Sequence, residues 1–224
     1  MDIKWICYAR PDDLADIELC RLLKDAGCVQ VQIGIESGDQ GQLNNMNKRC
    51  TVAQNAAALQ NCRKVGITSV ITMMIGFPGE TVASIQKSFR FLCENPPDFF
   101  YTAPFNARVE HVPILSPENR QKFSIQLAND GHSSQPYWRH KTMCSSEVGK
   151  HWMWFNQELM LNRISLSAGL FFKGILGFQP EQREALLDFQ LAAMQGQHKM
   201  RHMFGYIHRW SQYRLQKDVA AQLI

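Results

Sequence analysis

The strongest constraint on the fold is a regular alternation of strand-like and helix-like segments in the first half of the chain. Short, mostly apolar runs occupy residues 3–8, 29–35, 67–75 and 99–105, and helical patterns fill 14–26, 51–65 and 81–94 between them. The pattern recurs about every thirty residues, which is the length of a βαβ unit. Because such units place their strands in parallel through right-handed crossovers, the alternation predicts an α/β fold with a parallel sheet or partial barrel.

Local signals predict where these helices begin and end. Thr51-Val52-Ala53-Gln54 is a capping box that should start a helix, and Gly66 suits the left-handed residue that ends one. In the helix predicted at 14–26, the spacing directs Leu19, Leu22 and Leu23 toward the core.

The pattern changes after Phe105, where we expect mostly helices. Ser116-Pro117 predicts a helix that ends at Asn129-Asp130-Gly131. Two later helices are indicated by an apolar face at Val148, Trp152, Phe155 and Leu159 and by Pro180, which opens a helix through Met194. The sequence therefore predicts a partial parallel β/α barrel at 1–115 and a helical C-terminal extension at 116–224.

Composition restricts the kinds of function. A net charge of +4 is too small to imply nucleic-acid binding, and the basic stretch 199–217 is interleaved with apolar residues, as on a solvated helix face. No run approaches the roughly 18 apolar residues of a membrane span, and the N-terminus lacks a signal-peptide pattern. Scattered cysteines suit a reducing compartment. We expect a cytoplasmic protein with a small-molecule substrate and neither nucleic-acid nor membrane partners.

Histidines offer little sign of a metal site. His198 and His202 have the i, i+4 spacing of a ligand pair, but no third ligand accompanies them, so no metal site is predicted. The segment Trp138-Arg139-His140-Lys141-Thr142-Met143 is unusual in composition. It could contact a substrate, or it could be a surface connector that packs its tryptophan.

Polar and glycine-rich residues stand at the ends of the predicted strands. Because the strands of a β/α barrel present their carboxyl ends on one rim, Arg10, Glu36 and the turn at 76–80 should meet there. Glu36 lies within Gly34-Ile35-Glu36-Ser37-Gly38, and a carboxylate can accept hydrogen bonds from both ribose hydroxyls of a nucleoside. Gly34 and Gly38 would let the backbone approach a ligand closely.

The second segment is Gly76-Phe77-Pro78-Gly79. Its glycines permit a tight turn, Pro78 stiffens it, and its exposed backbone could pair with the edge of an adenine. Taken alone, either segment could be an ordinary turn from strand to helix. Their occurrence in order, one βαβ unit apart, favours a nucleoside site.

Together these segments resemble the S-adenosylmethionine (SAM) cradle of the radical SAM superfamily. The resemblance is carried by residues 5–12, 26–28, 33–38, 46–48, Thr51 and 75–81. It is greatest to the subgroup with an upstream cobalamin-binding domain. That family cleaves SAM reductively at a [4Fe–4S] cluster to give a 5′-deoxyadenosyl radical. The resemblance implies ribose and methionine contacts at Glu36 and Ser37, adenine contacts at Gly76, Phe77, Pro78 and Gly79, and a carboxylate contact at Arg10. A structural salt bridge is an equal alternative for Arg10.

The chain departs from that family at the cluster. No C-x3-C-x2-C triplet is present, and Cys20 and Cys28 are too far apart to replace it. By the resemblance, the first two strands of the barrel should precede Trp5. We therefore expect the C-terminal part of a larger enzyme, a fragment or split-gene product, inactive without an N-terminal half in cis or trans. The subgroup implies cobalamin on an upstream domain as a further cofactor and methyl transfer as the reaction.

Two other functions stay open at this point. A β/α hydrolase could use Glu36 as acid or nucleophile, but glycoside hydrolysis needs a second carboxylate at the rim. Glu80 is the candidate, and its place at a helix start also suits a cap. A noncatalytic binding subunit is the other alternative, which the missing cluster motif favours.

Overall fold

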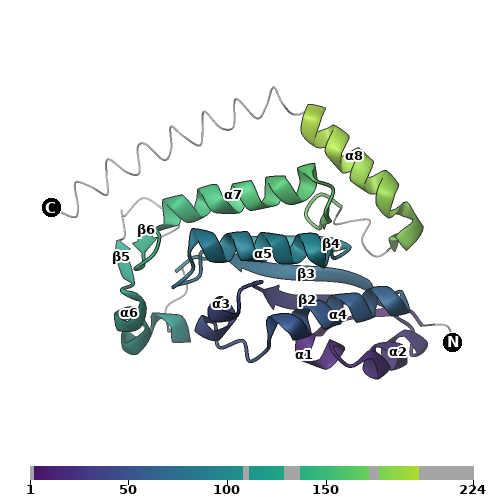
Figure 1. Cartoon of the computed structure of the whole chain (residues 1–224), viewed down its shortest axis with the longest axis horizontal. Helices are drawn as coiled ribbons and strands as arrows, with labels where there is room; N and C mark the ends of the chain where they lie inside the picture. The colour runs from purple at the N-terminus through teal and green to yellow at the C-terminus, as the bar shows by residue number, and fades with distance from the viewer. Residues whose placement is uncertain (1–2, 108–110, 129–136, 172–176, 197–224) are drawn as a thin grey trace.

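A parallel sheet organises the molecule, as the alternating pattern predicts (Figure 1). The computed structural model describes residues 3–107, 111–128, 137–171 and 177–196. Its main sheet has the order β1-β2-β3-β4-β7, with strands Trp5–Ala9, Cys28–Glu36, Thr68–Ile75, Phe99–Pro104 and Leu166–Ser167. Every neighbouring pair in this sheet is parallel, and β1 lies at an edge. The α/β prediction and the chain order of the first four strands are confirmed.

Helices connect the strands and continue after the sheet. They are α1 (Pro11–Leu14), α2 (Ile17–Asp25), α3 (Gln40–Asn45), α4 (Val52–Val65), α5 (Val82–Glu94), α6 (Pro117–Phe123), α7 (Ser145–Leu161) and α8 (Arg183–Gly196). Short 3-10 turns at Pro113–Leu115 and Pro180–Gln182 precede α6 and α8, and β5 (Gln126–Ala128) pairs antiparallel with β6 (Tyr137–Arg139).

Each face of the sheet has its own apolar core, because adjacent residues of a strand point to opposite faces. Ile71 and Phe100 belong to the larger core, which α4, α5 and α7 cover (Figure 1). Their neighbours Val70 and Phe99 belong to a smaller core on the opposite face, where α8 contributes Leu187. Strand β7 brings part of the predicted C-terminal extension into the sheet.

The capping signals of α4 are confirmed. The side chain of Thr51 accepts from the Gln54 backbone amide, and the side-chain oxygen of Gln54 accepts from the Thr51 backbone amide. Gly66 ends the helix with a φ of +73°. Sequence signals also place the start of α5 correctly at Thr81.

The helix predicted at 14–26 is present as α2, but it begins later, at Ile17, and a separate short helix α1 ends at Leu14. The later start follows from Asp16, whose side chain caps α2 by accepting from the Glu18 amide at 2.9 Å. The break changes which residues face inward: Cys20 is fully buried, whereas Leu22 is 65% exposed.

The predicted end of the helix after Ser116 is also wrong. Helix α6 stops at Phe123, because Ser124 adopts φ +52° and the following residues pair as β5 with β6. The Asn129–Gly131 stop lies outside the described residues.

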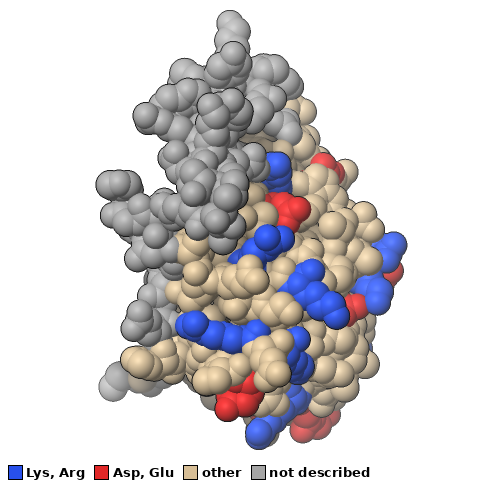
Figure 2. Space-filling view, turned by 90° about the vertical axis from the view of Figure 1, so that its left-hand side faces the viewer, with Lys and Arg blue, Asp and Glu red and all other residues tan. Residues whose placement is uncertain are grey.

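The inward face predicted for α7 is confirmed. Val148, Phe155 and Leu159 are buried, and the indole of Trp152 donates to the Thr102 carbonyl of β4 at 3.0 Å. His198, His202 and the basic stretch 199–217 lie outside the described residues. Within the described part of the chain, no helix is long and apolar enough to span a membrane. On the face shown in Figure 2, Lys and Arg side chains lie among Asp, Glu and uncharged residues.

Candidate functional site

A groove opens where β1 and β2 end. It has a volume of about 380 Å³ and is lined by Tyr8, Ala9, Arg10, Asp13, Gln32, Gly34, Glu36 and Thr72. Thr72 alternates with the buried Ile71, so this groove lies on the sheet face opposite the main helix layer. The structure thus brings together Arg10, Gly34 and Glu36 of the predicted site. It adds Asp13, a second carboxylate that the sequence did not single out.

Glu36 has an unusual backbone. Its φ is +61°, and the pairing of β2 with β3 shifts between Gly34 and Glu36. A left-handed conformation in a residue other than glycine costs of order 1–3 kcal/mol and is concentrated at functional sites. Because such a bulge re-aims a side chain, it accounts for Glu36 standing at the groove.

A lysine stands beside Glu36. Lys48 Nζ lies 3.4 Å from Glu36 Oε1. The backbone carbonyl of Lys48 accepts a hydrogen bond from the Arg10 guanidinium at 3.3 Å. The residues on either side of Lys48, Asn47 and Arg49, both have positive φ. Sequence reasoning included Lys48 only as part of a matching segment. The cluster of left-handed residues that presents it could not be read from the residues.

Gly34 lies beside the polar ends of two groove side chains. A Cβ there would lie 2.7 Å from both Glu36 Oε1 and Lys48 Nζ, so a larger residue would displace them. Arg10 shows the salt-bridge alternative, since its guanidinium lies 2.9 Å from the Asp12 carboxylate and its hydrogen bond lowers the pKa of Asp12. Arg10 is nevertheless half exposed and lines the groove, so its proposed ligand contact stays a prediction.

Ser37 and Gly38 face helix α5. The Ser37 hydroxyl is fully buried, lies 3.1 Å from the Ser88 hydroxyl and accepts from the Asp39 amide. A Cβ on Gly38 would meet Phe91 at 2.6 Å, so this glycine serves close packing with α5. The structure thus gives Gly38 a packing role, its approach to a ligand stays a prediction, and the side chain of Ser37 points into the protein.

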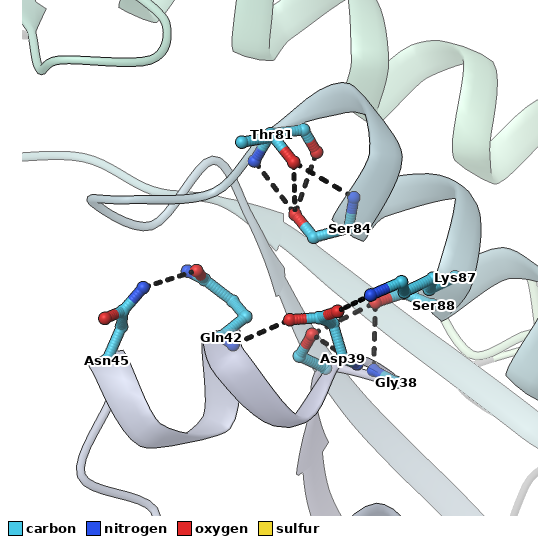
Figure 3. A network of polar contacts seen from close by, with 9 residues as sticks. Gly38, Asp39, Gln42, Asn45, Thr81, Ser84, Lys87 and Ser88 are labelled. Carbon is cyan, nitrogen blue, oxygen red and sulfur yellow. Dashed lines mark hydrogen bonds and ion pairs between the residues drawn. The ribbon is translucent and has the colours of Figure 1, made fainter.

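A polar network holds α3 against α5 (Figure 3). Asp39 caps α3 by accepting from the Gln42 amide at 2.9 Å, and it pairs with Lys87 of α5 at 2.7 Å. Asn45 donates to Gln42, whose own side-chain amide donates to the Phe77 carbonyl at 3.1 Å. Helix α3, which the sequence analysis did not predict, thus ties the turn after β2 to the turn after β3.

The turn Gly76–Gly79 is packed beneath later segments. Gly76 and Gly79 have φ of +84° and +91°, which confirms the need for glycine. A Cβ on Gly76 would collide with Val148 of α7, and one on Gly79 would meet Asn45 at 2.6 Å. Gly76, Phe77, Pro78 and Gly79 are not among the groove-lining residues, so a ligand that spans Glu36 and this turn stays a prediction.

Glu80 is a structural carboxyl group of this turn. It is 1% exposed and accepts from the Gly76 amide, and burial raises its pKa to about 8 despite that hydrogen bond. Its Oε1 has no partner among the described residues. Because Glu80 is turned into its own loop, it cannot supply the rim carboxylate that the hydrolase alternative assigned to it.

Cysteines of the described segments do not fit an iron–sulfur cluster. No group of three or more His, Cys, Asp or Glu side chains in these segments is placed to hold a metal ion. Cys20, Cys28, Cys50 and Cys62 are buried in the sheet and helix layers.

A parallel α/β sheet with a polar groove at the carboxyl ends of its strands defines the class of protein. Residues 2–92 match the family model of the radical SAM superfamily.

Individual relatives match a limited stretch. Anaerobic magnesium-protoporphyrin IX monomethyl ester cyclase of Cereibacter sphaeroides is 30% identical over 97 residues, 43% of this chain and 16% of the relative. An uncharacterized methyltransferase of Pyrococcus horikoshii is 29% identical over 41% of this chain and 20% of the relative. The chain thus spans less than a quarter of either length.

A solved structure supports the fold. Elp3 of Methanocaldococcus infernus superposes with a TM-score of 0.55 at 18% identity, covering 74% of this chain and 34% of that one.

Proposed function

We propose that this chain forms the SAM-binding part of a radical SAM enzyme. The observation that carries the proposal is Glu36, whose own left-handed backbone places it at a polar groove within the segment that matches the family model. Bound SAM would supply the 5′-deoxyadenosyl group for radical chemistry on a small-molecule substrate.

The residues of the groove have the donors and acceptors that such a ligand needs. The Glu36 carboxylate would accept from the two ribose hydroxyls, and the half-exposed Arg10 guanidinium would bind the methionine carboxylate. Gly34 leaves room beside Glu36. Backbone groups of Gly76–Gly79 would bind the adenine, and Ser37 would contribute through its backbone, because its side chain is buried.

Methyl transfer is the reaction we propose, supported by the similarity to the Pyrococcus horikoshii methyltransferase and by the resemblance to the cobalamin-associated subgroup. The cyclase relative supports a second candidate, a radical reaction without methyl transfer. A noncatalytic SAM-binding subunit is the third, favoured by cysteines that do not fit the cluster.

Binding of SAM to the full chain tests the assignment. Calorimetry should show binding by the wild type, and Glu36→Ala should weaken it by roughly 1–3 kcal/mol, because ribose hydroxyls lose a charged acceptor. Glu94→Gln, an exposed change at the end of α5, is the control and should bind like the wild type. Equal affinities for wild type and Glu36→Ala would refute the role of Glu36.

Cluster assembly tests the partner requirement. We propose that the cluster ligands come from outside these 224 residues, in the same polypeptide or another. Anaerobic iron–sulfur reconstitution of this chain should then give no stoichiometric [4Fe–4S] spectrum, because three thiolates cannot converge. A cluster spectrum abolished by replacing Cys7, Cys28 or Cys50 would contradict this.

A further inference from the structure

A segment far along the chain holds both ends of the Gly76–Glu80 turn. His140 Nε2 lies 3.3 Å from the Gly76 carbonyl oxygen, and the Thr142 hydroxyl donates to the Glu80 carbonyl. These two residues follow β6 and stand more than sixty positions from the turn they contact. The turn is therefore bracketed at its first and last carbonyl groups by one short segment.

The orientation of His140 is fixed by its surroundings. Its ring is stacked on Trp138, with centroids 5.4 Å apart and planes at 14°, and it is 4% exposed. Because a carbonyl oxygen only accepts, Nε2 carries the hydrogen, which leaves Nδ1 to accept from the Thr142 amide at 3.3 Å. Burial also lowers the pKa of His140, which favours this neutral form.

The segment is itself anchored to the sheet. Trp138 is buried and packs edge-on against Phe105, with ring centroids 5.0 Å apart, just after β4. Val148 of the following helix, α7, occupies the space where a Cβ on Gly76 would lie. His140 and Thr142 thus project from a firmly packed base.

The glycines of the Gly76–Glu80 turn make its backbone conformation dependent on restraint from neighbouring segments. Gly76 and Gly79 both adopt positive φ, and glycine visits many other conformations at little cost. A binding site made of backbone groups loses affinity when those groups must be ordered on binding. Hydrogen bonds to the Gly76 and Glu80 carbonyls fix the peptide planes at either end of the turn.

We propose that His140 and Thr142 are positioning residues that preorganise the Gly76–Glu80 turn, so that the C-terminal part of the chain controls ligand binding there. The identity of the ligand, SAM, rests on the proposed function, whereas the restraint of the turn does not. The segment Trp138–Met143, which the sequence marked as unusual, thereby acts on the ligand site through the turn.

Paired variants of the full chain test this role. Thr142→Val and His140→Leu remove a donor, whereas Thr142→Ser and His140→Gln keep one. Amide hydrogen exchange at residues 76–80 should be faster in the first two variants and near wild type in the second two. SAM affinity should fall roughly five- to tenfold in the donor-less variants, the effect of about one hydrogen bond, and recover in the conservative ones.

Amide hydrogen exchange in α4 controls for general destabilisation. Thr142 is exposed, so its replacement should leave the cores intact and amide exchange in α4 unchanged. Unaltered exchange at 76–80 would overturn the proposal, as would faster exchange with unchanged SAM affinity. If the wild type bound no SAM, the proposed function would fail, and exchange at 76–80 alone would decide whether the segment restrains the turn.

Discussion

At the scale of single residues, Glu80 is the most informative side chain of the site region. It is buried, one oxygen accepts from the Gly76 amide, and the other has no partner among the described residues. Such an arrangement suits a protonated carboxyl group, because an uncompensated buried charge is costly.

Glu80 should therefore make stability depend on pH. Its pKa rises from 4.5 to about 8 in the folded state, so the folded chain binds the extra proton between these values. Stability should fall as pH rises through that window, by roughly 3–5 kcal/mol in all, and stay low above it. Urea unfolding of wild type and Glu80→Gln at pH 5.5 and 8.5 measures this: the variant should lack this decline.

Glu94→Gln serves as the control for that measurement, since Glu94 is exposed. A wild-type decline that persists in Glu80→Gln would assign the pH dependence to another group. Loss of the fold in Glu80→Gln at pH 5.5 would contradict the protonated form, because glutamine closely mimics it.

Sequence reasoning at this scale succeeded where chemistry is local. Glu36 and Gly34 were identified from their types and their place after a strand, and both line the groove. The packing of Ser37 and Gly38 against α5 was not predicted, because it depends on Ser88, about fifty positions away. The ion pair of Glu36 with Lys48 likewise depends on the positive φ of Asn47 and Arg49, which their residue types did not predict.

At the scale of elements, capping signals carried the most information. Helix α4 has both bonds of its capping box: Thr51 Oγ1 accepts from the Gln54 amide at 3.1 Å, and Gln54 Oε1 accepts from the Thr51 amide at 2.8 Å. By contrast, a cap within a periodic run was overlooked at Asp16, which splits α1 from α2. Helix α3 was not predicted because it is short and is held by tertiary contacts, the ion pair of Asp39 with Lys87 and the hydrogen bond from Gln42 to the Phe77 carbonyl.

Removing the cap should destabilise the chain measurably. Thr51→Ala loses the acceptor for the Gln54 amide, and we expect the free energy of unfolding to fall by about 1 kcal/mol. Thr51→Ser keeps the hydroxyl and should stay close to wild type. Urea unfolding provides the measurement, and an unchanged midpoint for Thr51→Ala would show that the capping box adds nothing to stability.

At the scale of the whole molecule, the two sides of the sheet end differently. On one side, β7 continues the sheet beyond β4 and α8 closes the smaller core. On the other, no described strand pairs with the outer edge of β1. The edge also carries exposed apolar side chains, with Ile3 and Ile6 exposed by 59% and 49%. The pattern of apolar runs predicted the strand order. That the β1 edge has no described pairing strand and exposes apolar side chains becomes visible only in the assembled sheet.

An unpaired edge with apolar side chains is a template for strand pairing. We therefore expect the isolated chain to self-associate through β1 at micromolar concentration, unless a partner strand is supplied. Ile6→Lys places a charge on the edge strand and should shift the chain toward monomer. Leu22→Lys is the matched control, because Leu22 is 65% exposed on helix α2 and not on the edge strand, and it should not change the association. Size-exclusion chromatography with light scattering measures the association. A monomeric wild type would show that the chain covers this edge itself. Equal effects of both variants would assign the association to general surface hydrophobicity.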